Sequence, residues 1–408
     1  MQDPCLSFAP SPKFTLLESV LASDDVLATF SDPTQVSKLF GHTVGGILKS
    51  ERLCSIQQMA LVLQWVVQQA AACQQHLQAH PLKLLPTLRA SQSDQSSSHA
   101  AISTSLCCQL LCAMFLDCFD DSSRPGNGKW PHCNFEDILR SKSSLLNNPA
   151  SSTVHCIMQY FVSVHASLSG PRPLASDASF VVLHRSAISP NSSLRRADTW
   201  AKMEVPLCPV VVSRGSLDPR ISEGHVVVDF ANKVIGGGVL SGGNVQEEIM
   251  FSKHPEAIVT CLLCEQMYKT ESIMIYGVRC FSECEGYGGN FTFLRGAQPP
   301  SPSAITTVLG YSVAATAGCS ITCAPCYQPS HICHSACNRR QVCRAAHALA
   351  AAPRYVHARH SESVGWFLVY CNRACCRLQA HLQRRMGMRY IQRRSLCEVL
   401  GSGLGACV

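Results

Sequence analysis

Residues 226–251 read Val-Val-Val-Asp-Phe-Ala-Asn-Lys-Val-Ile-Gly-Gly-Gly-Val-Leu-Ser-Gly-Gly-Asn-Val-Gln-Glu-Glu-Ile-Met-Phe. The β-branched run at its start predicts a buried strand that ends at Asp229 and delivers this carboxylate to the edge of a sheet. Three glycines follow at 236–238, and glycine lets the backbone adopt positive φ angles and lets a ligand approach the main chain closely. Glu247 and Glu248 then place two adjacent carboxylates just ahead of an apolar segment. The stretch predicts a ligand site at the end of a strand.

Each part of this stretch has a chemical use. A glycine loop at the end of a strand suits a phosphate group, because its N–H groups can form an anion-binding concavity. If the segment that begins at Gln246 is extended, neighbouring side chains point to opposite faces, so that one of the two glutamates faces the ligand. A carboxyl group that is desolvated beside a ribose has a raised pKa and can serve as a general acid.

Each feature also has a plainer explanation when taken alone. A run of three glycines is most often a flexible loop, and an aspartate at the end of a strand is most often a turn or helix cap. Two adjacent glutamates are most often a solvated helix start, where acidic side chains complement the helix dipole. Their combination within residues 226–251 favours a functional site over three unrelated structural features.

The first part of the chain favours helices. Residues 51–80 are rich in glutamine, alanine and leucine, with apolar side chains at helical spacing, so they predict a helix that packs one face on a core. The serine-rich residues 91–98 predict a loop, and the apolar residues 100–119 predict a second, buried helix. Two shorter helices are expected at 135–139 and 154–164.

From about residue 180 the pattern favours strands. Short β-branched runs predict strands at 180–183, 209–213, 225–230 and 272–276, with a helix at 255–267. We expect the βαβ-type unit that ends with the last of these strands to contribute neighbouring strands of one sheet. The predicted fold class is α/β, with a mixed sheet flanked by helices and preceded by an all-helical accessory region.

Composition places the chain among globular proteins, with 408 residues, 46% apolar and 15% charged. It has no uninterrupted apolar run of about 18 residues and no signal-peptide pattern at its start, so we expect an intracellular protein without a membrane partner, in the nucleus, the cytoplasm or both. The charge is uneven along the chain. Residues 294–408 contain 13 Arg, no Lys, two Glu and no Asp, whereas residues 1–293 carry a net charge of −4.

This change in composition sets residues 294–408 apart. One hypothesis is that this tail arises from a frameshift, a retained intron or a mis-built gene model. A second hypothesis is that the chain is a zinc-binding interaction protein. Cysteine and histidine are the usual zinc ligands, and the tail contains Cys319, Cys323 and Cys326 followed by further cysteines and histidines. Only one Cys-x2-Cys pair is present in this tail, so no metal site is predicted there.

The central motif resembles the signature of the poly(ADP-ribose) glycohydrolase family. That signature has three glycines, a short spacer and Gln-Glu-Glu before an apolar residue, here Gly236-Gly237-Gly238 and Gln246-Glu247-Glu248. The segment 228–232 is similar to the strand-end motif of the family. The segment 281–287 is similar to its aromatic Tyr-Ser-x3-Gly-Tyr motif, with Phe281 in place of the first tyrosine.

The resemblance implies a macrodomain-like core that binds ADP-ribose. Residues 1–175 would form the helical accessory domain, 176–293 a catalytic core, and 294–408 a tail of undetermined fold. The implied reaction is hydrolysis of ribose–ribose O-glycosidic bonds in poly(ADP-ribose), which releases ADP-ribose and needs no cofactor and no metal. The implied partners are poly(ADP-ribose) and poly(ADP-ribosyl)ated proteins, and direct binding of nucleic acid is not expected.

The resemblance also implies roles for individual residues. Glu248 would be the general acid that protonates the leaving ribose oxygen and then, as a carboxylate, activates water. Glu247 would hold ribose hydroxyls, and Asp229 would support the catalytic loop. The implied substrate-binding residues are Asn232, Gln246, Tyr287, Gly236, Gly237, Gly238 and, near the adenine, Leu217 and Asp218.

The sequence departs from the family in one respect. A second glycine-rich loop, built around Gly-Asn-Trp-Gly-Cys-Gly, is not found, and the resemblance is expected to end near Phe293. The catalytic core is therefore expected to be incomplete. The alternative function is a catalytically impaired macrodomain that binds ADP-ribose without turning it over.

Overall fold

The computed structural model of the protein covers most of the first 297 residues. Backbone and side chains are described for residues 5–88, 97–121, 124, 130–140, 148–170, 173–189, 191–193, 196, 198–199, 202 and 227–297, and the backbone alone for 95–96, 226, 311–313, 321–323 and 366–370. Within these ranges, no helix combines the length and the apolar character that a membrane span requires.

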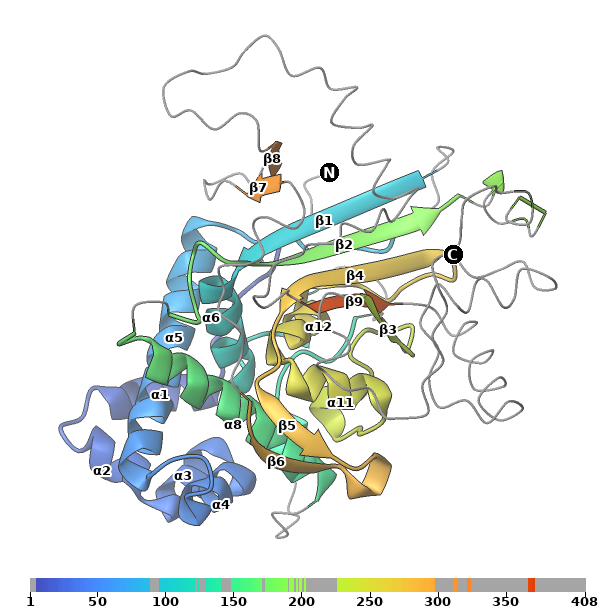
Figure 1. Ribbon diagram of the computed structural model, residues 1–408. Coiled ribbons are helices and arrows are strands. Elements are labelled where there is room, and N and C mark those ends of the chain that lie inside the picture. Colours follow the sequence, from blue (N-terminus) through green and yellow to red (C-terminus); the bar gives the residue numbers. More distant parts are fainter. Residues whose placement is uncertain are drawn as a thin grey trace.

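Eight α-helices are found among the described residues up to Ser167, and they gather on one side of the molecule in Figure 1. They are α1 (Pro12–Leu21), α2 (Val26–Ser31), α3 (Pro33–Phe40), α4 (His42–Ser50), α5 (Ile56–Ala79), α6 (Thr104–Phe115), α7 (Glu136–Leu139) and α8 (Pro149–Ser167). Helix α5 begins with a capping box. Ser55 Oγ accepts the Gln58 N–H at 3.3 Å, and Gln58 Oε1 accepts the Ser55 N–H at 3.2 Å. Such a cap stabilises a helix by about 1 kcal/mol.

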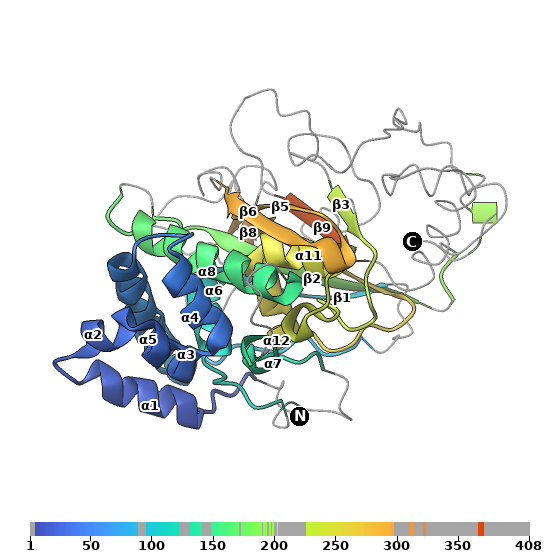
Figure 2. The ribbon, with the colours of Figure 1, turned by 90° about the horizontal axis from the view of Figure 1, so that it is seen from below.

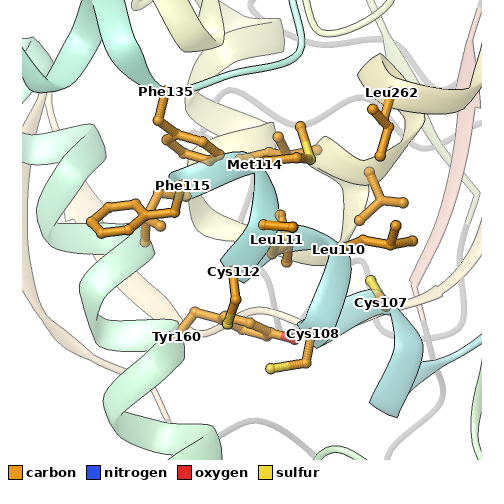
Figure 3. Close-up of a cluster of buried hydrophobic side chains, with 14 of the residues drawn as sticks. Cys107, Cys108, Leu110, Leu111, Cys112, Met114, Phe115, Phe135, Tyr160 and Leu262 are labelled. Carbon is orange, nitrogen blue, oxygen red and sulfur yellow. The ribbon is translucent and has the colours of Figure 1, made fainter. Parts of the chain in front are cut away.

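Helix α6 occupies the centre of the hydrophobic core (Figure 3). Its side chains are apolar nearly all round, which is typical of a helix with no solvent-facing side. The ring of Phe115 lies 5.8 Å from that of Phe135 and 5.4 Å from that of Phe161 on α8. The same core includes buried side chains of the sheet and Phe281, which follows the sheet strand at 271–278 in sequence. The helical region and the sheet therefore share one core.

The main sheet has five strands in the order β1-β2-β4-β9-β3. Their bounds are β1 (Gln95–Ser103), β2 (Phe180–Ile188), β3 (Val226–Asp229), β4 (Glu271–Val278) and β9 (Trp366–Tyr370). Neighbouring strands are antiparallel except β9 and β3, which are parallel. Side chains of β2 alternate between buried and partly buried, as expected for a strand with one face on the core.

Short elements connect the strands and carry the site described below. They are η3 (Val239–Ser241), α11 (Gln246–Lys253), η4 (Pro255–Ile258), α12 (Val259–Leu263), β5 (Ser282–Glu285), η5 (Gly288–Asn290) and β6 (Thr292–Gly296). Strands β5 and β6 form a hairpin, and β7 (Tyr311–Val313) pairs with β8 (Ile321–Cys323). Figures 1 and 2 show α11 and the β5–β6 hairpin close to α8 of the helical region, in agreement with their contacts.

A buried ion pair holds β2 to β4. Arg185 and Glu271 have no exposed side-chain surface, and Nη2 of the arginine lies 2.9 Å from Oε2 of the glutamate. The Nε–H of Arg185 donates to Oε1 of Glu271 at 3.2 Å. The other guanidinium hydrogens go to backbone carbonyls, at 2.8 Å from Leu85 O and from Glu265 O and at 2.9 Å from Gln266 O. These hydrogen bonds replace the contacts with water that the two charged groups lose when they are buried.

The predicted strands at 180–183, 225–230 and 272–276 are confirmed as β2, β3 and β4, and the predicted helix at 51–80 is confirmed as α5. The helices expected at 135–139 and 154–164 are present as α7 and α8. The predicted strand at 209–213 lies outside the described residues.

The prediction of a loop at 91–98 is wrong for residues 95–98, which belong to β1. This strand is at the edge of the sheet, where polar side chains are tolerated because one side has no partner strand. The helix expected at 100–119 is shorter. Ser103 caps its start by accepting the Leu106 N–H at 3.1 Å, and Asp117 follows its end with a φ of +58°.

Two further expectations need correction. The helix expected at 255–267 is divided into the 3-10 turn η4 and the short helix α12. The two strands of the βαβ-type unit, β3 and β4, lie in one sheet but are not neighbours, because β9 lies between them. Consecutive strands usually lie next to each other in a sheet, but here a strand from much later in the chain lies between them.

Candidate active site

Strand β3 delivers Asp229 to the inside of the molecule. This side chain is 1% exposed, and neither carboxylate oxygen has a hydrogen-bond partner among the described residues. Burial raises the pKa of Asp229 well above its ordinary value, and the charges of Glu247 and Glu248 raise it further. The Phe230 amide opposes this rise only partly. A buried carboxyl group is costly to ionise, so this environment favours the protonated form of Asp229.

Gln246 clamps the end of β3. Its Oε1 accepts the Phe230 N–H at 2.9 Å, and its Nε2 donates to Val228 O at 3.3 Å. Both ends of the side-chain amide are thus engaged on the backbone that flanks Asp229. The role that the structure shows for Gln246 is to join helix α11 to the strand, and contact with a substrate stays a prediction.

Both glutamates lie in the first turn of helix α11 and are buried, 4% and 7% exposed. The extended arrangement that we considered from the sequence is therefore not formed. The plainer explanation was right that the pair starts a helix but wrong that it is solvated. Glu247 Oε2 accepts the Asn232 N–H at 2.8 Å. Glu248 Oε1 accepts the Gly238 N–H at 2.9 Å, and its Oε2 accepts the Val245 N–H at 3.0 Å.

The glycine loop is packed directly against these carboxylates. Gly237 has a φ of +53°, and a Cβ atom on it would lie 2.4 Å from Glu248 Oε1 and 2.9 Å from Glu247 Oε2. Gly243 approaches from the other side, where a Cβ atom would lie 2.9 Å from Glu248 Cγ. Glycine at both positions lets the loop enclose the glutamate side chains without collision.

Much of the hydrogen-bonding capacity of the loop is used internally. The Gly237 N–H donates to Val234 O at 3.2 Å, and the Gly243 N–H donates to Gly238 O at 2.7 Å. The Gly238 N–H donates to the carboxylate of Glu248 at 2.9 Å. These bonds shape a loop that fixes the catalytic candidates, and the predicted contact of Gly236, Gly237 and Gly238 with a phosphate stays a prediction.

Tyr287 lies beside this loop on the turn of the β5–β6 hairpin. The next residue, Gly288, donates its N–H to Asn244 O at 2.9 Å and so ties the hairpin to the loop. The side chain of Tyr287 is 60% exposed, which is high for an aromatic ring. An exposed aromatic ring on a turn that is tied to this loop has a face on which a ligand can pack.

The helical region also contributes to the site, which the sequence did not indicate. Ser252 Oγ donates to Glu248 O at 2.7 Å and contacts Thr153 Oγ1 of α8 at 3.2 Å. A Cβ atom on Gly242 would lie 3.7 Å from Ala150 at the start of α8. Serine and threonine hydroxyls often bond to the carbonyl four residues earlier in a helix. Such residues in the sequence therefore do not predict a link between α11 and α8.

Some expectations fall outside the described residues. These are Leu217 and Asp218, the cysteines and histidines of the tail, and most of the region where a second glycine loop was sought. Among the residues that are described, no group of three or more His, Cys, Asp and Glu side chains is arranged to hold a metal ion.

Comparison with known proteins gives the family. Residues 51–185 match the model of the poly(ADP-ribose) glycohydrolase helical domain, and residues 197–307 match the model of its macro domain fold. The second match ends at residue 307, a short distance past Phe293, and the rest of the tail lies outside it.

Named relatives agree with these matches. The chain is 33% identical over 199 residues to poly(ADP-ribose) glycohydrolase 1 of Arabidopsis thaliana, which covers 49% of this chain and 34% of that protein. It is 56% identical over 61 residues to poly(ADP-ribose) glycohydrolase 1 of Caenorhabditis elegans, which covers 15% of this chain and 8% of that protein. The chain thus spans about a third of the first relative and less than a tenth of the second. With its helical domain followed by a macrodomain fold, and with its buried glutamate pair enclosed by a glycine loop, the chain belongs to the poly(ADP-ribose) glycohydrolase family.

Proposed function

We propose that this protein hydrolyses the ribose–ribose O-glycosidic bond of poly(ADP-ribose) and releases ADP-ribose. The observation that carries the proposal is the placement of Glu247 and Glu248. Both are buried, both are held by backbone N–H groups, and both lie next to Asp229 at the end of β3. Most glycoside hydrolases use a pair of oriented Asp or Glu carboxyl groups in catalysis.

Glu248 acts as the general acid in this mechanism. Each of its oxygens accepts one backbone N–H, which leaves further acceptor capacity on each oxygen for a proton or a substrate hydroxyl. The protonated form delivers its proton to the leaving ribose oxygen. The resulting carboxylate then removes a proton from water as it attacks the oxocarbenium-like carbon.

The other residues bind and orient the substrate. Glu247 holds ribose hydroxyls, and Asn232, whose N–H donates to Glu247 Oε2, contacts the ribose. Tyr287 packs on the ligand, and Leu217 and Asp218 lie near the adenine. The polymer reaches the site as free poly(ADP-ribose) or on poly(ADP-ribosyl)ated proteins, within the nucleus, the cytoplasm or both.

Release of ADP-ribose from purified poly(ADP-ribose) tests the proposal. The wild-type chain is compared with Glu248→Gln and with Glu283→Gln, a control at an exposed carboxylate on β5. Loss of a general acid lowers the rate about 10²–10⁴-fold, so release is expected to be lost in Glu248→Gln and kept in the control.

Absence of release from folded wild-type protein would refute hydrolysis by this chain. A titration with ADP-ribose then distinguishes an impaired binding domain, which would bind the nucleotide, from a chain with no site at all.

A further inference from the structure

Two cysteines from distant parts of the chain meet where α8 packs on the β5–β6 hairpin. Cys156 on α8 and Cys284 on β5 are 128 residues apart in sequence, and their Sγ atoms are 3.5 Å apart. Phe291 and Phe293 of the hairpin pack around them in a small separate cluster. A disulfide has an S–S distance of about 2.05 Å, so an approach of about 1.5 Å, within reach of side-chain rotation, is enough to form the bond.

The two thiols differ in their access to solvent. Cys156 is completely buried, whereas Cys284 is only partly buried. Burial raises the pKa of Cys156 well above its ordinary value, and the hydrogen-bonded thiol of Cys284 raises it further. The thiolate is the reactive form of cysteine, so Cys284 is the thiol that meets a dissolved oxidant first.

Other cysteines in the described part of the chain lack this arrangement. Cys108 and Cys112 interact on one turn of α6, but both are enclosed in the main core. Cys280 lies near the hairpin, where its Sγ contacts Ser282 O at 3.4 Å. Cys156 and Cys284 thus combine contact between two separate elements with access for an oxidant.

We propose that Cys156 and Cys284 are an oxidative modification site, a reversible disulfide that fastens helix α8 to the hairpin. A peroxide is the oxidant. The Cys284 thiolate attacks a peroxide oxygen and breaks the O–O bond, which gives a sulfenic acid and, with the thiol proton, water. The Cys156 sulfur then attacks the Cys284 sulfur and breaks its S–O bond, and the departing hydroxide takes the Cys156 proton. Two thiols lose two electrons and two protons, and one hydrogen peroxide becomes two waters.

The bond has a consequence for the site. Cys284 lies three residues before Tyr287, and the hairpin turn is tied to the glycine loop through Gly288 N–H and Asn244 O. The disulfide therefore restrains the approach of Tyr287 to a ligand. This consequence rests on the proposed function, whereas the disulfide itself does not.

Peptide mapping of the full chain tests the disulfide without any use of poly(ADP-ribose). Reduced protein is treated with hydrogen peroxide, its remaining thiols are blocked, and it is digested without reductant. The expected product is a linked peptide pair that contains Cys156 and Cys284. Because the bond closes a loop of more than 100 residues, the thermal midpoint is expected to rise by roughly 5 °C or more and to return when reductant is added.

Three variants make the result specific. Cys284→Ser and Cys156→Ala should both lack the linked peptide pair and the rise of the thermal midpoint. Both variants are used because Cys156 is completely buried, and a substitution there is less well tolerated than one at the partly exposed Cys284. Cys280→Ser should keep both. A folded wild-type protein without the Cys156–Cys284 pair, or with Cys284 linked to Cys280 instead, would overturn the proposal, whether or not the protein hydrolyses poly(ADP-ribose).

Discussion

Replacement of Gly237 by alanine is expected to damage the glutamate pair more than it damages the fold. A Cβ atom on Gly237 would lie 2.4 Å from Glu248 Oε1 and 2.9 Å from Glu247 Oε2, distances that real Cβ atoms essentially never show. The atoms that must move are the carboxylate oxygens to which the mechanism assigns proton transfer and ribose binding. The neighbouring backbone stays in place because the loop is fixed by its own hydrogen bonds.

The magnitude has two parts. The φ of Gly237 is +53°. Alanine in this left-handed region costs about 1–2 kcal/mol. Displacement of packed atoms adds about 1–3 kcal/mol. A shift of about 1 Å in a catalytic group lowers activity on the order of 100-fold.

Gly242→Ala separates the two parts. Gly242 also has a positive φ, +87°, but its nearest neighbour would be Ala150 Cβ at 3.7 Å, an ordinary contact. This variant should show the loss of stability from strain alone and keep most of its activity. Unfolding in urea and release of ADP-ribose from poly(ADP-ribose) are measured for both variants. Equal losses of activity in the two variants would refute the argument that collision with the glutamates is the cause.

Two further predictions concern buried charge. The pKa of Asp229 is raised in the folded protein, so the folded state keeps a proton that the unfolded chain releases above the ordinary pKa of 3.8. The contribution of this group to the unfolding free energy is therefore fully present below that pH. It is lost as the pH rises through the pKa of the folded state. Asp229→Asn should therefore gain unfolding free energy relative to wild type between about pH 4 and pH 7, and parallel pH profiles in urea titrations would contradict this. Arg185→Met leaves the fully buried carboxylate of Glu271 without its partner and should cost about 3–5 kcal/mol. The matched change Arg295→Met, in the exposed pair with Glu283, should cost no more than about 1 kcal/mol, and similar losses in the two variants would count against the burial argument.

The sequence predicted element types well where a local pattern was strong. Residues 51–80 showed a helical period, and the strand at 180–183 and the strand ending at Asp229 were β-branched, so α5, β2 and β3 followed from local preferences. Strand β1 was missed because an edge strand can be polar, and serines at 95–98 look like a loop. The position of β9 between β3 and β4 depends on pairing with β4 between residues that are 88 to 97 positions apart in sequence, which no local pattern encodes.

The site was predictable in its members but not in its geometry. The order of glycines, amide and glutamates brought Asp229, Glu247 and Glu248 to attention, and the structure places them together. The sequence left open whether the glutamates start a helix or lie in an extended segment, because Val245 before them lacks the polar side chain that usually marks a helix start. Glu248 takes over half of that role by accepting the Val245 N–H itself.

The double use of Glu248 explains why the helical region belongs to the site. A carboxylate that caps its own helix stays oriented only if that helix is fixed relative to the glycine loop. Helix α11 is fixed on one side by Gln246, which grips the end of β3, and on the other by Ser252, which reaches Thr153 on α8. Since Thr153 and Ser252 are both buried and one hydrophobic core runs through both regions, the accessory helices form part of the scaffold that orients Glu248. A macrodomain core without α8 would keep the motif and lose one of the two supports that orient it.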